Sequence, residues 1–204
     1  MKNFYNQIYS VLGSLTPLKG DCGRACNKAC CEGDKDGDGM YLFPFEEELY
    51  TALPSWASIS ETDFEYDKNK FAPLFSCDGI CERSMRPLSC RIFPLTPYIA
   101  KDGELEVIVD PRSVGMCPLS ALYVEDFEPD FVKAVEEVGK LLLTNPKQKS
   151  FSKPFQGCLM IADLYKRRKK YEKSFINTIN PLHACFALTG ASDGKRARVC
   201  LRRA

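Results

Sequence analysis

The chain has 204 residues, of which 45% are hydrophobic and 27% are charged, so it is long enough to bury a core of its own. The net charge is only +1, but residues 1–150 carry 16 Lys and Arg against 24 Asp and Glu, whereas residues 151–204 carry 12 against 3. No apolar run approaches the roughly 20 residues that a membrane span needs, and the first residues are too polar for a secretory signal. We therefore expect a cytoplasmic protein with no membrane segment.

The first predicted element is a short amphipathic helix over residues 3–12. Phe4, Ile8 and Leu12 recur there at helical spacing. The following stretch, residues 21–39, has almost no apolar side chains other than cysteine. Such a segment cannot offset its ordering entropy by burial, so it is either disordered or held by something other than a core.

The second predicted helix covers residues 45–52. Pro44 opens it, and three glutamates occupy its first turn, where the helix dipole favours acidic side chains. Residues 53–76 show no regular pattern and are expected to be irregular. Their aromatic residues are the expected core anchors: Trp56, Phe64, Tyr66, Phe71 and Phe75.

The second half of the chain shows clearer patterns. Tyr98–Ala100 and Glu104–Val109 flank a Lys-Asp-Gly turn, which predicts a β-hairpin. Apolar residues at helical spacing predict a helix over Phe127–Leu143 and another over Leu159–Phe175. The expected fold is mainly α (α+β), with irregular cysteine-rich metal-binding loops held by several helices and one small β-hairpin.

An acidic stretch in the first half resembles the start of a calcium-binding loop. Asp34, Asp36 and Asp38 would take positions 1, 3 and 5, with Gly39 at position 6. Phe45 occupies position 12, where the loop requires a bidentate glutamate. An Asp-Gly turn is therefore the favoured interpretation.

Eleven cysteines are a high total for a chain of this length. In the reducing cytoplasm, clustered cysteines bind metal more often than they form disulfides. Seven of them fall into two separate segments, which we expect to meet in space and to hold a metal centre. These are Cys22, Cys26, Cys30 and Cys31 in the first segment, and Cys77, Cys81 and Cys90 in the second.

The spacing of these cysteines suits metal ligation. Residues four apart lie on one helical face, with Cβ atoms about 5–6 Å apart, so Cys22, Cys26 and Cys30 form a ladder from which Cys31 points away. Cys77 and Cys81 repeat the same spacing. Thiolates around a metal carry a net negative charge that needs cations nearby, and three arginines lie within a few residues of the second segment's cysteines. They are Arg83, Arg86 and Arg91.

The ligand chemistry points to zinc or to an iron–sulfur cluster. The chain has a single histidine, His183, so the ligand set is all sulfur, which suits both. Cys117 precedes Pro118, as in the Cys-Pro that closes bacterial ferredoxin motifs, and it is the eighth ligand candidate. The spacings differ from the two Cys-x2-Cys pairs of a zinc ribbon, which favours iron–sulfur.

These cysteines and one continuous string resemble a known family. The string is Arg86-Pro87-Leu88-Ser89-Cys90-Arg91-Ile92-Phe93-Pro94. Together with the two cysteine segments, it resembles the zinc- or iron-chelating CxxCxxCC family, which includes YkgJ-type proteins and the flagellin lysine N-methylases. The resemblance covers about residues 20–118. It implies that the seven cysteines of the two segments are metal ligands.

The remaining candidates are less suited to metal binding. Cys158, Cys185 and Cys200 are interpreted as small apolar residues or isolated thiols, and His183 as a core or surface histidine. The basic run at residues 166–170 is interpreted as a solvated helix face, because few aromatic residues interleave it as a nucleic-acid site would require.

The sequence therefore predicts two parts. Residues 1–150 form a cysteine-rich metal-binding domain, and residues 151–204 form a basic helical segment that packs on it and docks a protein partner. The expected function is electron transfer or the handling of a metal or cluster. A protein lysine N-methylase-like enzyme and a structural zinc interaction module are the alternatives, so the sequence leaves open whether the protein is an enzyme.

Overall fold

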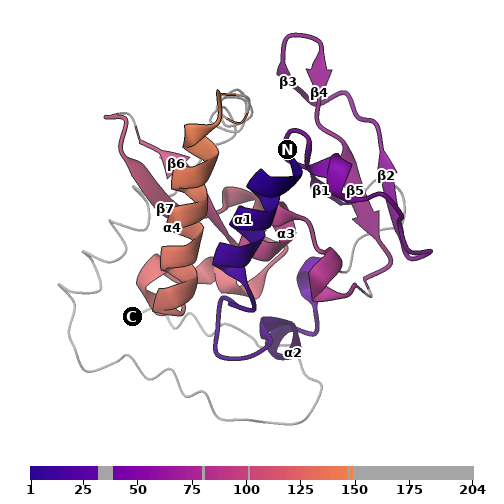
Figure 1. Cartoon of the computed structure of the whole chain (residues 1–204). Helices are drawn as coiled ribbons and strands as arrows, with labels where there is room; N and C mark the ends of the chain where they lie inside the picture. Colours follow the sequence, from indigo (N-terminus) through magenta and orange to yellow (C-terminus); the bar gives the residue numbers. More distant parts are fainter. Residues whose placement is uncertain (32–38, 80, 101, 147, 149–204) are drawn as a thin grey trace, which may run out of the picture. The chain divides into compact units, whose positions relative to one another are not determined.

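The structure is a computed structural model that describes residues 1–31, 39–79, 81–100, 102–146 and 148. Four α-helices and seven strands lie in these ranges (Figure 1). The helices are α1 (Lys2–Leu12), α2 (Cys22–Cys26), α3 (Leu88–Ile92) and α4 (Pro129–Thr144). The strands are β1 (Met40–Tyr41), β2 (Ala57–Ser60), β3 (Glu65–Asp67), β4 (Lys70–Phe71), β5 (Leu74–Cys77), β6 (Leu95–Ile99) and β7 (Leu105–Val109).

The prediction of a mainly α fold is wrong, because the chain is a mixed α and β protein with three small antiparallel sheets. The strand order is β1-β5-β2 in one sheet, and β3–β4 and β6–β7 form hairpins. Four of the strands come from the stretch that was predicted to be irregular. They have only two to four residues each, which is too short for an alternating apolar pattern to show.

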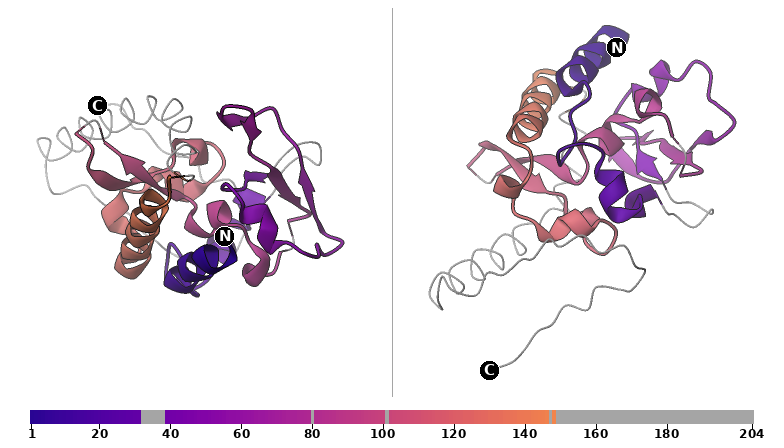
Figure 2. Two further views of the ribbon diagram at one scale, coloured as in Figure 1. Left: turned by 45° about the horizontal axis from the view of Figure 1, so that its top comes forward. Right: turned by 90° about the horizontal axis from the view of Figure 1, so that it is seen from below.

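The main hydrophobic core lies between α1, α4, α3 and the β6–β7 hairpin. The predicted N-terminal helix is confirmed, and it buries Tyr5, Ile8 and Leu12 completely. α1 and α4 lie side by side in Figures 1 and 2. α4 confirms the helix predicted over Phe127–Leu143 and buries an apolar stripe against α1 and the hairpin. The stripe consists of Phe131, Ala134, Val135, Val138 and Leu142.

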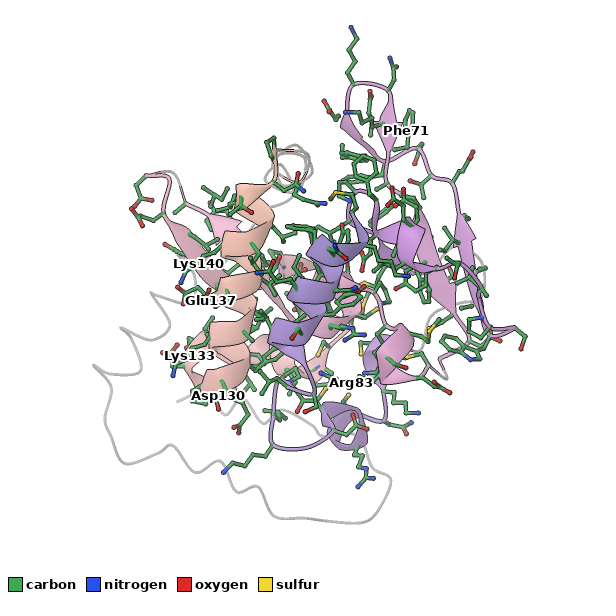
Figure 3. All side chains as sticks on the ribbon, in the orientation of Figure 1. Phe71, Arg83, Asp130, Lys133, Glu137 and Lys140 are labelled. Atoms are coloured by element: carbon green, nitrogen blue, oxygen red, sulfur yellow. The ribbon has the colours of Figure 1, made fainter. Side chains whose placement is uncertain are left out.

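The outer face of α4 carries charged side chains. Asp130, Lys133, Glu137 and Lys140 point away from α1 along this face (Figure 3). Lys140 pairs with Glu137 at 2.7 Å and with a second glutamate at 2.9 Å. Such exposed pairs contribute little to stability, so α4 is held mainly by its buried face.

The predicted hairpin is confirmed as β6 and β7, which pair in register from Leu95 opposite Val109 to Ile99 opposite Leu105. α4 packs closely on it at Gly139. A Cβ at this glycine would lie 2.7 Å from Cβ of Pro97 and 3.1 Å from both Cδ atoms of Leu105. The absence of a side chain at Gly139 therefore sets how closely the helix approaches the hairpin.

Replacing Gly139 with alanine is expected to destabilise the fold. Alanine has a higher helix propensity than glycine, which favours the variant by about 1 kcal/mol. Overpacking the close contact with the hairpin costs about 1–3 kcal/mol, and this loss should exceed the gain. Urea denaturation followed by circular dichroism measures the difference. Lys133→Ala, at an exposed position of the same helix, should change stability little; a Gly139→Ala protein as stable as wild type would contradict the close contact.

The β1-β5-β2 sheet leads directly into the second cysteine segment. Cys77 is the last residue of β5 and pairs with Ala57 of β2. Among the five aromatic residues predicted as core anchors, Phe75 on this strand is buried, whereas Phe71 on the β3–β4 hairpin is 49% exposed (Figure 3). Trp56, Phe64 and Tyr66 are half-buried. The prediction was wrong for Phe71, because β3 and β4 form a separate two-stranded hairpin in which both residues of β4 are exposed.

The predicted helix over residues 45–52 is a single 3-10 turn, Glu46–Leu49. Phe45 has a left-handed backbone, with φ at 68°, which is incompatible with the start of an α-helix. The next residue, Glu46, is completely buried. Further 3-10 turns cover Ala29–Cys31, Arg83–Met85, Pro111–Ser113, Pro118–Ala121 and Val124–Asp126.

Candidate metal centre

The first cysteine segment is a short helix followed by a turn. Asp21 caps α2 by accepting a hydrogen bond from the backbone N–H of Gly23 at 3.0 Å. Because α2 is helical, Cys22 and Cys26 lie one turn apart, and Sγ of Cys26 is 3.5 Å from the carbonyl oxygen of Cys22. The helix ends at Asn27, whose left-handed backbone redirects the chain into the turn that carries the two consecutive cysteines.

The second cysteine segment runs from the end of β5 to α3. Its backbone comes close to the first segment at Gly79, where an added Cβ would be 3.0 Å from the carbonyl oxygen of Cys31. Gly79 also has φ at 75°, a conformation that glycine adopts without strain. Residues nearly 50 positions apart in the sequence are therefore in contact, as the sequence predicted for the two segments.

The thiols that gather around α2 form a group that we call the first set. It consists of Cys22, Cys26, Cys30 and Cys117. Burial raises the pKa of Cys22, and the nearby thiols of Cys26 and Cys117 raise it further. Burial also raises the pKa of Cys117, with a smaller contribution from Cys26. Cys117, predicted only from its Cys-Pro dipeptide, thus lies with cysteines more than 80 residues earlier in the chain.

The remaining thiols form the second set, around the end of β5 and the start of α3. It consists of Cys31, Cys77, Cys81 and Cys90. A hydrogen bond between Cys31 and Cys81 is the main cause that raises the pKa of Cys81. Burial raises the pKa of Cys77, which also hydrogen-bonds with Cys81. Burial raises the pKa of Cys90 well above its usual value, and the other three thiols of the set add to this effect.

The consecutive cysteines join the two sets. Sγ of Cys30 is 4.0 Å from Sγ of Cys31. Their hydrogen bond lowers the pKa of Cys30 and raises that of Cys31 to about 11. All eight described cysteines are free thiols, so each is able to act as a ligand once deprotonated.

The arginines of the second segment have different roles. Arg86 donates from Nε to Sγ of Cys81 at 3.1 Å, so it faces the second set directly. Arg83 lies near α2 in Figure 3 and donates to the carbonyl oxygen of Leu15; burial lowers its pKa. Arg91 donates to the carbonyl oxygens of Arg86 and Ser84 at 2.9 Å and 2.8 Å. Of the three predicted cations, Arg86 is the one in contact with a thiol.

Glu46 is a buried carboxylate near Cys90 that the sequence did not single out. Its carboxylate accepts hydrogen bonds from the Tyr9 hydroxyl at 2.5 Å, the Phe43 N–H at 2.9 Å and the Leu88 N–H at 2.6 Å. Leu88 starts α3, the helix that carries Cys90, so Glu46 ties this helix to α1. The guanidinium carbon of Arg91 lies 4.1 Å from the centre of the Tyr9 ring and completes the network.

Sγ of Cys30 and Sγ of Cys31 are in contact as a pair. Within the described ranges, no three Cys, His, Asp or Glu side chains are placed closely enough to hold a metal ion. Zinc–sulfur bonds of about 2.3 Å require four sulfurs within about 4 Å of one another, so the side chains would have to rotate on binding. Changing a side-chain rotamer costs on the order of 1 kcal/mol, whereas structural zinc binding supplies about 10 kcal/mol or more. The donor chemistry therefore fits zinc or an iron–sulfur cluster, and convergence of the sulfurs on a metal stays a prediction.

Several predicted features lie outside the described residues. These are the aspartates of the calcium-like loop at residues 34–38, the helix over Leu159–Phe175, the basic segment 151–204, and Cys158, His183, Cys185 and Cys200. In the part of the chain that is described, no helix combines the length and apolar character needed to cross a membrane.

Comparison with protein families, with curated proteins and with solved structures finds no match to this chain. The resemblance to the CxxCxxCC family therefore stays a prediction carried by the two cysteine segments and the string from Arg86 to Pro94.

Proposed function

We propose that this protein binds a metal centre through cysteine thiolates and acts in electron transfer or in the handling of that metal or cluster. The observation that carries the proposal is the approach of two segments that bear seven of the eight described free thiols, with Gly79 close to Cys31, Sγ of Cys30 4.0 Å from Sγ of Cys31, and Arg86 donating to Cys81. Clustered free thiols beside a fixed cation are the environment that a thiolate-bound metal requires.

The raised pKa values of several thiols imply that metal binding would release protons. Burial raises the pKa of Cys22, Cys77 and Cys90, so these groups are neutral thiols at pH 7 without metal. A metal ligand must be a thiolate, so each of these residues loses a proton when it binds. Affinity should therefore rise with pH, and Arg86 offsets part of the negative charge that accumulates.

We favour an iron–sulfur cluster over zinc, because the chain presents only sulfur ligands and its cysteine spacings differ from those of a zinc ribbon. A bound cluster would supply one-electron redox chemistry. Residues 151–204, with 12 basic against 3 acidic side chains, would serve to dock an acidic protein partner.

Metal and acid-labile sulfide analysis of anaerobically purified full-length protein tests this proposal. We expect iron and sulfide in similar amounts, and broad absorbance near 400 nm that bleaches on reduction. Stoichiometric zinc without sulfide would support a zinc-binding role instead and would exclude electron transfer. Protein that contains no metal, and that takes up neither zinc nor iron with sulfide on reconstitution, would contradict metal binding altogether.

A further inference from the structure

The turn Ala29–Cys31, which follows α2, holds two cysteine sulfurs in contact. Asn27 and Lys28 both have left-handed backbones, with φ at 51° and 57°, and they redirect the chain into this turn. The N–H of Cys31 then donates to the carbonyl oxygen of Lys28 at 2.7 Å, which closes the turn. Sγ of Cys30 lies 4.0 Å from Sγ of Cys31, so the fold presents two adjacent thiols side by side.

The two sulfurs differ in their access to solvent. Cys30 is exposed, whereas Cys31 is half-buried. The backbone of Cys31 lies against the second cysteine segment, since a Cβ added at Gly79 would be 3.0 Å from the carbonyl oxygen of Cys31. A small reagent in solvent therefore reaches the sulfur of Cys30 first, and the sulfur of Cys31 is already in contact with the product.

We infer that Cys30 and Cys31 form an oxidation site, at which a peroxide converts the two thiols into a disulfide. This inference goes beyond the proposed function and does not depend on metal binding. An accessible thiol with a second thiol beside it is the arrangement in which the first oxidation product condenses to a disulfide before it is oxidised further.

The reaction has two steps. The thiolate sulfur of Cys30 attacks one oxygen of hydrogen peroxide; an S–O bond forms, the O–O bond breaks, and hydroxide leaves as water with the proton of the thiol. The sulfur of Cys31 then attacks Sγ of this sulfenic acid; the S–S bond forms, the S–O bond breaks, and hydroxide leaves as water with the proton of Cys31. The two thiols lose two electrons and two protons in total, and one peroxide becomes two waters.

The disulfide should open again easily. Neighbouring Cα atoms are closer together than the about 4.4–6.8 Å of ordinary disulfides, so a bond between Cys30 and Cys31 is strained and is readily reduced. While it is closed, neither sulfur is a thiolate that could bind a metal. Oxidation and the proposed metal binding would therefore exclude each other at this turn.

Peptide mass spectrometry of the full chain detects the bond. Protein treated with a chelator, so that no metal shields the thiols, is exposed to hydrogen peroxide, and the remaining free thiols are alkylated before digestion with trypsin. Cleavage after Lys28 and Lys35 places both cysteines, and no other, in the peptide 29–35. This peptide should be unalkylated and lighter by two hydrogens, and reduction with dithiothreitol should return a form that accepts two alkyl groups.

Two single substitutions test the order of the steps. Cys31→Ser should leave a sulfenic acid at Cys30 that dimedone traps. Cys30→Ser should give several-fold less trapped product at Cys31, because that sulfur is half-buried. Cys22→Ser, on α2, is the matched control and should form the disulfide as wild-type protein does.

Three results would overturn the inference. The peptide 29–35 could accept two alkyl groups after peroxide treatment, carry sulfinic acid instead of a disulfide, or be linked to the peptide 71–83 through Cys77 or Cys81. Each of these results leaves the metal-binding proposal as it stands. Conversely, protein that takes up no metal would contradict the proposed function without affecting the disulfide.

Discussion

If the protein holds the proposed metal centre, removing that metal with a chelator is expected to open residues 21–31 and 77–86, while the packing of α1 against α4 persists. The core residues come from α1, α3, α4, the β6–β7 hairpin and Phe127, and none of them comes from α2. A helix of five residues does not form alone in water. Ligation at structural sites supplies about 10 kcal/mol of folding free energy, so its loss should leave these two segments without their main support.

Hydrogen–deuterium exchange resolved by peptide measures this effect. In metal-loaded protein, amides of residues 21–31 should be protected, and after chelation they should exchange at nearly the rate of an unfolded chain. Peptides from α4 serve as the internal control and should keep their protection. Unchanged protection of the cysteine segments after complete metal removal would show that packing alone holds them.

Replacing Glu46 with alanine is expected to lower the free energy of unfolding by about 3–5 kcal/mol, because three hydrogen-bond donors lose their acceptor and a cavity is left. The donors are the Tyr9 hydroxyl and the N–H groups of Phe43 and Leu88. Glu46→Gln keeps an oxygen for Tyr9 and Leu88 and should restore much of the stability. Denaturant unfolding of the three proteins gives the comparison.

Glu48→Ala is the matched control for Glu46→Ala, since it lies on the same turn. Its side chain is 50% exposed, and its carboxylate is 3.8 Å from the N-terminal amino group. Substitution there should change stability by no more than about 0.5 kcal/mol. Equal effects at the two positions would contradict a special role for the buried carboxylate.

The difference in unfolding free energy between wild-type protein and Glu46→Gln should depend on pH, because only the wild-type side chain can ionise. Burial is the main cause that raises the pKa of Glu46 above its usual value of 4.5. An acid with a raised pKa stabilises the fold most below its unfolded pKa, and this contribution is lost as pH rises through the folded pKa. Compared with Glu46→Gln, which cannot ionise, wild-type protein should therefore lose stability as pH rises from about 4.5.

The sequence predicted the elements whose side chains repeat over several turns or end in a recognisable turn. α1 and α4 present apolar residues at helical spacing, and the β6–β7 hairpin is marked by Lys-Asp-Gly. The strands β2–β5 are too short to show a period, so the fold class was predicted wrongly. Glu46 could not be told from Glu47 and Glu48, because glutamate is ordinarily exposed and only tertiary contacts turn one of them inward.

For the candidate site, residue types and spacing predicted the eight cysteines as metal ligands, which stay a prediction, and three nearby arginines without distinguishing Arg86, the one that donates to a thiol. The division of the cysteines into two sets depends on where the chain folds back, as at Gly79 against Cys31, and local spacing contains no information about that. The hydrogen-bond partners of Arg91 could not be predicted from the sequence either, since its guanidinium donates to backbone carbonyl oxygens, those of Arg86 and Ser84.

The adjacency of Cys30 and Cys31 has a consequence for the proposed metal binding. Neighbouring Cα atoms are about 3.8 Å apart, so neither cysteine can shift without moving the other. Once one of the two thiolates is bound, the turn Ala29–Cys31 would be fixed, and the entropy cost of binding through the second thiolate would be lower.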